Sequence, residues 1–273
     1  MARRTNLRAL VLLPALALAA TVAGCAEEVN TGGQSQAGEE VQLINEGQLT
    51  TCTHLPYPPF QFTQNGQTVG FDVDIVDLVA KDLGVEQSIF DTSFEGIESG
   101  QSFNTGQCDL AAAAITINDK RDRVMDFSKG YFDANQALLV KKGSGIQGLE
   151  QLRGKTLGVQ LSTTGEDYAE QNKAKYGYTT RQFEDLALLQ TAVKTGQVDA
   201  AINDNSVLYD FVKQNPDTEV TAEFETGEQY GIAVKTGNGA LRAKINEVID
   251  RAKQDGTYDR IYEKWFGKKP QSN

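Results

Sequence analysis

GFDVDIVDLVAKDL, residues 70–83, is the stretch that decides the fold class, because its apolar side chains recur at near-helical spacing and end before Gly84. This spacing predicts a helix. Apolar runs typical of buried strands follow, and the last of them leads at once into another helical pattern. The strand-like runs cover residues 110–117, 137–140 and 157–161, and residues 240–266 carry a closing helical pattern. Strands that alternate with helices predict an α/β fold with largely parallel sheets.

Two stretches far apart in the chain are similar to each other. QALLVKKG at residues 136–143 resembles QYGIAVKTG at residues 229–237. Because the chain is long for one α/β domain, the pair predicts two crossings between two lobes. The first lobe is expected to contain residues 41–133 and 230–273, and the second lobe residues 134–229.

The composition is that of a globular protein, and it excludes two classes of function. The chain has 273 residues, 40% of them hydrophobic and 23% charged, with 26 basic and 37 acidic side chains and a net charge of −11. An acidic surface repels phosphates, so nucleic acid is not an expected partner. One histidine and three cysteines, with no CxxC or HExxH spacing, predict no metal site.

The N-terminus has the pattern of an export signal. Three arginines precede an apolar run over residues 9–20, which is shorter than the roughly 18 residues that a membrane-spanning helix needs. The following VAGC, residues 22–25, resembles a bacterial lipobox. This implies that residues 1–24 are removed and that Cys25 is lipidated, with palmitate among its acyl chains. The alternative is an exported soluble protein in which Cys25 merely lies near the cleavage site.

The segment after the lipobox is predicted to be a tether. Residues 26–40 contain no aromatic side chain and one large aliphatic residue, Val29. Residues 25–40 are therefore expected to form a lipid anchor and a flexible linker, and the globular part begins near Val41. Loss of residues 1–24 removes three arginines and changes the net charge from −11 to −14. The expected location is the extracytoplasmic face of the bacterial cell membrane.

Two cysteines remain once Cys25 carries a lipid. Cys52 and Cys108 form an even pair in an oxidising compartment, which predicts one disulfide. Two buried free thiols are the alternative.

Several motifs resemble those of one known family, in the same order along the chain. The signature of that family matches residues 70–83, and the others are YPPF at 57–60, DLAAAAITINDKR at 109–121, DFSKGYF at 126–132, GVQLSTTGEDYA at 158–169 and DAAINDN at 199–205. The chain resembles the family 3 solute-binding proteins of ABC importers. The resemblance implies a two-lobe α/β fold of the periplasmic-binding-protein type II class (Venus flytrap), with two hinge crossings. It also implies capture of a polar L-amino acid, glutamate-like, glutamine-like or otherwise polar, and delivery to an ABC permease, by a monomer without cofactor or catalysis.

The resemblance assigns ligand contacts in the first lobe. Arg121 matches the arginine that binds the ligand carboxylate, a role that suits the two parallel N–H donors of a guanidinium. A solvated arginine in a basic run is the alternative. Thr116 matches a position that binds through its backbone N–H and hydroxyl, although a buried threonine can also bond to its own backbone. The carbonyl of Ala114 matches an acceptor for the ligand ammonium.

Three residues of the second lobe complete the expected site. Thr163 and Thr164 match positions that bind the ligand carboxylate, and Thr163 with Glu166 also fits a capping box at a helix start, where free N–H groups attract anions. Asp204 matches the aspartate that pairs with the ligand ammonium, and a cap or hinge contact is the alternative. Closure of the lobes is expected to pair both ligand charges.

The expected contacts to the ligand side chain are aromatic or polar. Tyr57 and Phe94 match positions whose rings sandwich the side chain, whereas isolated aromatics often belong to a core. His54 stands where the family often has aspartate. Its imidazole is expected to donate to an acidic or amide side chain, or to cap a loop.

Two other classes of function fit the same fold. A dehydratase-like enzyme is one, although the chain has no GxSxG motif, no metal cluster and a single histidine. An amino acid sensor is the other, although the sequence offers no second membrane helix or effector domain.

Overall fold

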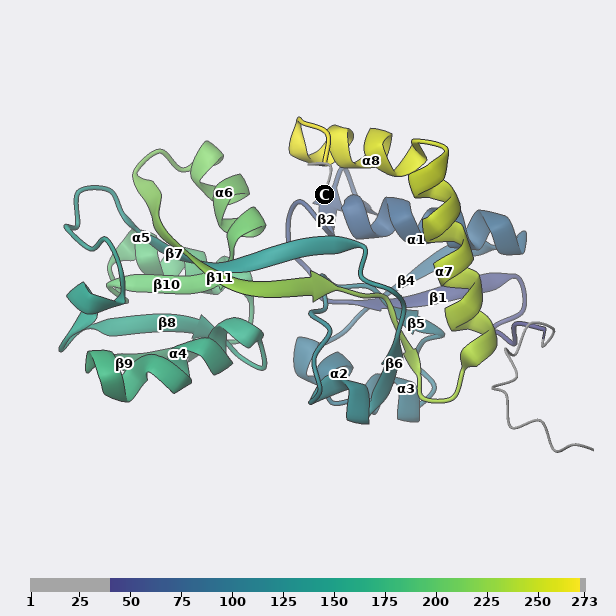
Figure 1. Cartoon of the computed structure of the whole chain (residues 1–273), viewed down its shortest axis with the longest axis horizontal. Helices are drawn as coiled ribbons and strands as arrows, with labels where there is room; N and C mark the ends of the chain where they lie inside the picture. The colour runs from purple at the N-terminus through teal and green to yellow at the C-terminus, as the bar shows by residue number, and fades with distance from the viewer. Residues whose placement is uncertain (1–39, 271–273) are drawn as a thin grey trace, which may run out of the picture. The chain divides into compact units, whose positions relative to one another are not determined.

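Two five-stranded sheets, with helices packed against them, form the framework of the computed structural model, which describes residues 40–270 (Figure 1). The first sheet has the strand order β4-β1-β5-β12-β6, and the second has the order β11-β7-β10-β8-β9. We call the part of the chain around each sheet the first and the second lobe. The prediction of an α/β fold with two lobes is confirmed.

The first lobe contains segments from both ends of the described chain. In Figure 1, α1 and α8 lie above its strands, and α2 and α3 lie below them. Its strands are β1 (Gln48–Thr53), β4 (Glu86–Asp91), β5 (Leu110–Ala111), β6 (Met125–Phe127) and β12 (Ala233–Lys235), with a separate hairpin of β2 (Phe62–Gln64) and β3 (Gln67–Val69). Its helices are α1 (Phe71–Leu83), α2 (Phe94–Glu98), α3 (Gln101–Asn104), the 3-10 turn η1 (Arg121–Arg123), α7 (Gly239–Gln254) and α8 (Thr257–Phe266).

The second lobe is continuous in sequence. Its strands are β7 (Phe132–Lys141), β8 (Thr156–Gln160), β9 (Thr179–Phe183), β10 (Ala200–Asp204) and β11 (Thr218–Tyr230). Its helices are the 3-10 turn η2 (Leu149–Leu152), α4 (Thr164–Tyr176), α5 (Leu186–Thr195) and α6 (Asn205–Gln214).

The prediction of largely parallel sheets is wrong for half of the strand pairs. In the first sheet β1 pairs parallel with β4 and β5, whereas β12 pairs antiparallel with β5 and β6. In the second sheet β8 pairs parallel with β9 and β10, whereas β7 pairs antiparallel with β10 and β11. A chain that leaves one lobe and later returns runs the opposite way through the sheets. The strands that make or follow the two crossings are therefore antiparallel to their neighbours.

The two crossing strands, β7 and β11, pair with each other along most of their length and run from one sheet to the other in Figure 1. The register joins Tyr230 to Phe132 and Glu228 to Ala134, with an irregularity between Phe224 and Glu228. An interrupted ladder is a place where a pair of strands bends and twists more easily.

Two predicted elements are shorter than expected. Only Leu110–Ala111 of the predicted strand 110–117 belongs to the first sheet, because Ala114 has a φ of 50° and turns the chain out of the extended conformation. The predicted helical stretch 240–266 is divided into α7 and α8 at Gly256, whose φ of 74° cannot continue a right-handed helix.

The start of α1 explains the glycine in the signature stretch. The N–H groups of Phe71 and Asp72 donate to the carbonyls of Pro59 and Phe60 at 2.9 and 3.0 Å. Gly70 has a φ of 146°, and a Cβ there would lie 2.0 Å from the Phe60 carbonyl oxygen. Glycine is therefore needed for the helix to dock directly onto the YPPF loop.

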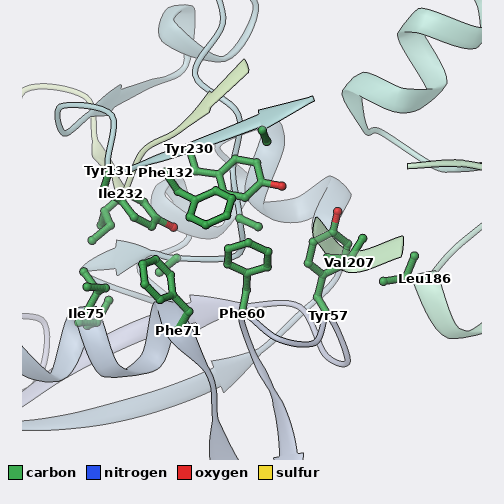
Figure 2. Packing of buried hydrophobic residues seen from close by; sticks show 14 of the residues in the cluster. Tyr57, Phe60, Phe71, Ile75, Tyr131, Phe132, Leu186, Val207, Tyr230 and Ile232 are labelled. Atoms are coloured by element: carbon green, nitrogen blue, oxygen red, sulfur yellow. The ribbon is translucent and has the colours of Figure 1, made fainter. Parts of the chain in front are cut away.

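A cluster of aromatic rings holds the first-lobe ends of the crossing strands. Phe132 begins β7 and Tyr230 ends β11, and their rings stack with centroids 5.4 Å apart. Phe60 meets Phe132 edge to face at 4.9 Å, and Phe71 packs on the same group, as Figure 2 shows. Such pairs add about 0.5–1.5 kcal/mol each beyond the area that they bury. The aromatic cluster therefore holds the first-lobe ends of β7 and β11 in place.

The two cysteines of the globular part form a disulfide. Cys52 in β1 and Cys108 before β5 are buried and joined, with their Cα atoms 5.5 Å apart. The prediction of a disulfide is confirmed, and the alternative of two free thiols is wrong. The predicted cleavage site, Cys25 and most of the predicted tether lie outside the described residues.

Candidate functional site

A pocket that is partly open to solvent lies between the two lobes. Its lining residues come from the loop after β1, from α2, from the segment between β5 and η1, from the ends of β8 and β10, and from the start of α4. They are His54, Tyr57, Gln61, Phe94, Ala113, Ala114, Thr116, Arg121, Gln160, Thr163, Thr164 and Asp204. The structure brings together all nine residues that the sequence assigned to a ligand.

Arg121 is the one arginine or lysine among the lining residues, and it is 3% exposed. Its Nη1 donates to the carbonyl of Thr116 at 2.8 Å, and its Nη2 donates across the cleft to the carbonyl of Ser162 at 3.2 Å. Burial lowers the pKa of Arg121, while nearby carboxylates, Glu98 first among them, raise it. The Phe94 ring centroid lies 5.2 Å from its Cζ. The solvated-arginine alternative is wrong, because the guanidinium is buried in the cavity wall.

The start of α4 faces the cavity from the second lobe. The Thr163 hydroxyl accepts from the Glu166 N–H at 3.2 Å, so the predicted cap is confirmed. The Glu166 carboxylate accepts from the N–H of Ser162 at 2.7 Å, one residue earlier than in a standard capping box. The backbone N–H groups of Thr163 and Thr164 make no hydrogen bond within the described residues. Free N–H groups at a helix start form a binding site for anions.

Asp204 is 6% exposed and ends β10. Its carboxylate accepts from the hydroxyl of Tyr57 at 2.9 Å, from the amide of Gln136 at 2.5 Å and from the hydroxyl of Tyr230. Burial raises its pKa to about 6, and the neighbouring carboxylate of Glu228 adds to the rise. The alternative of a helix cap is wrong, because the Asp204 side chain makes no capping hydrogen bond. The alternative of a hinge contact is confirmed, because Tyr230 at the end of the crossing strand β11 donates to this carboxylate.

Glu228 is a carboxylate next to the site that the sequence reasoning missed. It lies in β11, and its Oε2 accepts from Thr116 at 3.0 Å and from Thr164 at 2.9 Å, one hydroxyl from each lobe. Gln136 in β7 donates to both of its carboxylate oxygens at 3.2 Å. The Thr116 hydroxyl therefore bonds across the cleft rather than to its own backbone. The sequence offered one signal for these residues, namely their place at the two predicted crossings. Gln136 is the first residue of the first similar stretch, and Glu228 directly precedes the second.

Unpaired acceptor atoms line one wall of the cavity. Nδ1 of His54 lies 2.9 Å from the carbonyl of Thr92, which only accepts, so this nitrogen carries the hydrogen and caps the loop. The other ring nitrogen, Nε2, has no partner among residues 40–270, and it is an acceptor whenever the ring carries one hydrogen. Gln61 is 1% exposed and donates to the His54 carbonyl at 3.3 Å, while its Oε1 is also without a partner there. Gln61, Ala113 and Gln160 are the lining residues that the sequence reasoning missed.

Residues 49–268 match the family model of the bacterial extracellular solute-binding proteins, family 3. The chain belongs to this family. The predicted recognition is confirmed, and the match covers both lobes and the two crossings of this solute-binding protein.

Curated and structural relatives of the solute-binding protein have related names. The ABC transporter glutamine-binding protein GlnH of Bacillus subtilis (strain 168) is 40% identical over 212 residues, which is 76% of each chain. A solved ancestral arginine-binding protein bound to arginine is 42% identical with a TM-score of 0.77, over 81% of this chain and 99% of that one. The arginine-, lysine-, histidine-binding protein ArtJ of Geobacillus stearothermophilus is 34% identical with a TM-score of 0.75, over 82% and 97%. All three names describe amino acid binding, and that of GlnH also names an ABC transporter, which agrees with a role other than catalysis.

Two further features of residues 40–270 concern membrane crossing and metal binding. None of their helices combines the length and the apolar character that a membrane crossing requires. The same residues contain no group of three or more histidine, cysteine, aspartate or glutamate side chains placed to hold a metal ion.

Proposed function

We propose that this solute-binding protein captures one polar L-amino acid between its lobes and presents the closed form to the permease of an ABC importer. The observation that carries the proposal is a buried guanidinium, Arg121, and a buried carboxylate, Asp204, that face one cavity from opposite lobes. An amino acid carries the two complementary charges on one carbon. The names of GlnH, the ancestral arginine-binding protein and ArtJ support this class of ligand.

The proposed binding mode pairs each charge of the ligand with groups from both lobes. The ligand carboxylate lies between Arg121 and the free N–H groups of Thr163 and Thr164. Its ammonium donates to Asp204 and to the carbonyl of Ala114. Both lobes are then held together by the ligand, so binding favours the closed state.

The rings of Tyr57 and Phe94 flank the ligand side chain in this proposal. The polar end of that side chain meets Nε2 of His54 and Oε1 of Gln61, two buried acceptors without a partner in the described chain. An acceptor left unpaired in a buried site is unfavourable, so a ligand that supplies N–H donors is preferred. We therefore propose a carboxamide or a guanidinium side chain, and not a carboxylate.

The charges around the cavity support the same choice. Glu98, Asp204 and Glu228 all contribute negative charge near Arg121. A second carboxylate on the ligand would add repulsion without a second cation to pair it. This narrows the earlier expectation, which included glutamate, to ligands such as glutamine or arginine.

The location and the lobe boundaries are part of the proposal. We place the protein on the extracytoplasmic face of the membrane, with residues 1–24 removed and a lipid on Cys25, and as a monomer. The support is the export signal and lipobox-like VAGC. The antiparallel pairing of β7 with β11 supports lobes of residues 41–133 plus 230–273 and 134–229.

Calorimetric titration of residues 26–273, freed of carried-over ligand by unfolding and refolding, tests the proposed function. We expect saturable one-to-one heat with glutamine or arginine and none with glutamate. Heat with glutamate alone would refute the proposal that the ligand side chain supplies N–H donors. Silence with every common amino acid would refute amino acid capture. Incorporation of labelled palmitate, and its loss in Cys25→Ser, tests the anchor separately.

A further inference from the structure

Ala114 has a backbone conformation that alanine rarely adopts. Its φ is 50°, it is 5% exposed, and it lines the cavity. A residue other than glycine in the left-handed region costs about 1–3 kcal/mol and persists only where the surroundings impose the conformation. The carbonyl oxygen of Ala114 accepts no hydrogen bond from the part of the chain that the structure describes. Another group must therefore hold Ala114 in this conformation while leaving the Ala114 carbonyl free.

The group that holds it is the carboxylate of Asp72, in the first turn of α1. The N–H of Ala114 donates to Asp72 Oδ2 at 2.7 Å. The other oxygen, Oδ1, accepts from the hydroxyl of Tyr131 at 2.6 Å, and the carbonyl of Tyr131 accepts from the hydroxyl of Tyr258 at 2.5 Å. The carboxylate is thus fixed from α1, from the residue before β7 and from α8.

The negative charge of Asp72 does not stabilise the folded state. Asp72 is 1% exposed, and no arginine or lysine forms an ion pair with it within residues 40–270. Burial raises its pKa to about 6, against the two hydrogen bonds that lower it. A buried charge without a cation is unfavourable. Asparagine would carry no charge, but with a single acceptor oxygen it could accept only one of these two hydrogen bonds. A fixed charge beside the cavity points to a role in binding.

The second lobe repeats the arrangement. Ser162 also has a left-handed backbone, with a φ of 64°, and its N–H donates to the Glu166 carboxylate at 2.7 Å. Its carbonyl accepts from Arg121. Ala114 lines the cavity and Ser162 contacts the lining residue Arg121, and each is held through its N–H by a carboxylate from the first turn of a helix.

We infer that Asp72 is a positioning residue for the ligand: it holds the Ala114 peptide in its left-handed conformation, so that the Ala114 carbonyl accepts from the ligand ammonium. Asp72 acts through Ala114 and does not itself touch the ligand. This inference rests on the proposed function, because the ammonium belongs to the proposed amino acid.

Asp72→Asn and Asp74→Asn form a matched pair for the test. Both residues lie in the first turn of α1, so both changes remove the same interaction with the helix dipole. Asp74 instead accepts from Lys264 and Trp265, and it makes no contact with Ala114. We expect Asp72→Asn to weaken binding of the amino acid that the wild type prefers by about tenfold or more, as for loss of one charge-assisted hydrogen bond. Asp74→Asn should stay within about twofold, since its partners lie outside the cavity.

Two readouts separate positioning from a purely structural role. The melting temperature of ligand-free Asp72→Asn at pH 7.5 should not fall below that of the wild type, because the variant removes an unpaired buried charge. Adding Ala114→Gly to Asp72→Asn should recover about threefold or more of the lost affinity, because glycine adopts the left-handed region without strain. If Asp72→Asn does not fold, Tyr131→Phe provides the test, since it frees one oxygen of Asp72 and should weaken binding about threefold.

The outcomes are distinguishable. Wild-type affinity in Asp72→Asn, or in Tyr131→Phe where that variant is used, overturns the inference and leaves the proposed function intact. A loss of affinity that follows a drop in melting temperature, with no recovery from Ala114→Gly, also overturns it. Failure of the wild type to bind any amino acid overturns the proposed function and the inference together.

Discussion

At the scale of single residues, Arg121 provides the sharpest prediction. It supplies the one guanidinium in the cavity wall, and its Nε has no hydrogen bond within the described residues. Two charge-assisted hydrogen bonds contribute about 1.5–3 kcal/mol each, so Arg121→Ala should weaken amino acid binding about 100-fold or more. Arg121→Lys keeps the charge but loses the paired donors, and an intermediate loss is expected. Calorimetry measures the affinities.

The neighbouring Arg123 is exposed and serves as the control for Arg121. Arg123→Ala should bind as the wild type does, because a solvated arginine contributes little. An Arg121→Ala protein that folds and binds within tenfold of the wild type would show that the ligand carboxylate is held elsewhere.

The Asp204 and Glu228 pair predicts a dependence on pH. The pKa of Asp204 is raised from 3.8 to about 6, so the folded state holds this proton more tightly than the unfolded state. The free energy of unfolding of the ligand-free protein should therefore fall as the pH rises from 3.8 to about 6. Affinity for an ammonium should change the other way and be lost as the pH falls through about 6. Glu228→Gln removes a negative charge, lowers the pKa of Asp204 and should move the acid loss of affinity to lower pH.

Titration of the dissociation constant between pH 7.5 and 4.5 measures this shift. Glu225→Gln makes the same change in the same strand, β11, at an exposed position, and should leave the curve in place. Identical curves for Glu228→Gln and the wild type would mean that the two carboxylates do not interact.

The residues that the sequence predicted and those that it missed differ in a physical way. Arg121, Thr163 and Asp204 lie in local motifs, where a strand end or helix start fixes the direction of the side chain. Glu228 lies in a strand with alternating exposure, and it contacts the lining residues Thr116 and Thr164 because β11 crosses between the lobes beside β7. Gln61 depends on the path of the YPPF loop. No local pattern encodes the partner of such residues, because the contacts form between segments about 100 residues apart or through a loop turn.

At the scale of elements, the start of α4 joins stability to the site. The Thr163 hydroxyl accepts from Glu166 and donates to the carbonyl of Gln160 at 2.7 Å, which ties the helix to the end of β8. Loss of an N-cap costs about 0.5–2 kcal/mol, so Thr163→Ala should lower the free energy of unfolding by that amount. Thr163→Ser should restore most of it. Urea unfolding followed by circular dichroism measures both.

Thr195→Ala is the matched control for the cap, because Thr195 ends α5 and its hydroxyl donates within its own helix. Its unfolding free energy should change by less than about 0.5 kcal/mol, as for most surface changes. Equal losses in Thr163→Ala and Thr195→Ala would mean that the hydroxyl of Thr163 does not act as a cap.

Helices and strands also differ in how far the sequence predicts them, because only some of their features depend on local signals. The helix α1 was predicted to its last residue, because apolar spacing and a C-terminal glycine are local signals. The directions of the strands were not, because they depend on where the chain crosses between lobes. The apolar run after residue 110 indicated burial correctly, and the turn at Ala114 that ends β5 is imposed by a distant carboxylate, Asp72.

At the scale of the whole molecule, the lobes are held closed by few polar contacts. Tyr57 of the first lobe donates to Asn203 at 2.6 Å or to Asp204 at 2.9 Å in the second, and Arg121 donates to the carbonyl of Ser162. Thr116 also donates to Glu228 at 3.0 Å, and Tyr230 donates to Asp204. The aromatic cluster around Phe132 and Tyr230 fixes the first-lobe ends of the two crossing strands. The polar contacts between the lobes, and not this cluster, therefore set the balance between the open and closed forms. A ligand that adds contacts to both lobes then shifts that balance.

Tyr57→Phe tests this balance, because it keeps the ring and removes the hydroxyl that spans the lobes. The ligand-free variant should populate the open form more, with a larger radius of gyration by small-angle X-ray scattering than the ligand-free wild type. Saturating amino acid should bring both proteins to the same radius. The apparent affinity should fall by the factor by which the closed form is depopulated, about 3–10-fold for one hydrogen bond of ordinary strength. Tyr209→Phe, whose hydroxyl bonds to Glu223 within the second lobe, should change neither quantity. Equal radii for ligand-free Tyr57→Phe and wild type, with an unchanged affinity, would place the control of closure in the crossing strands themselves.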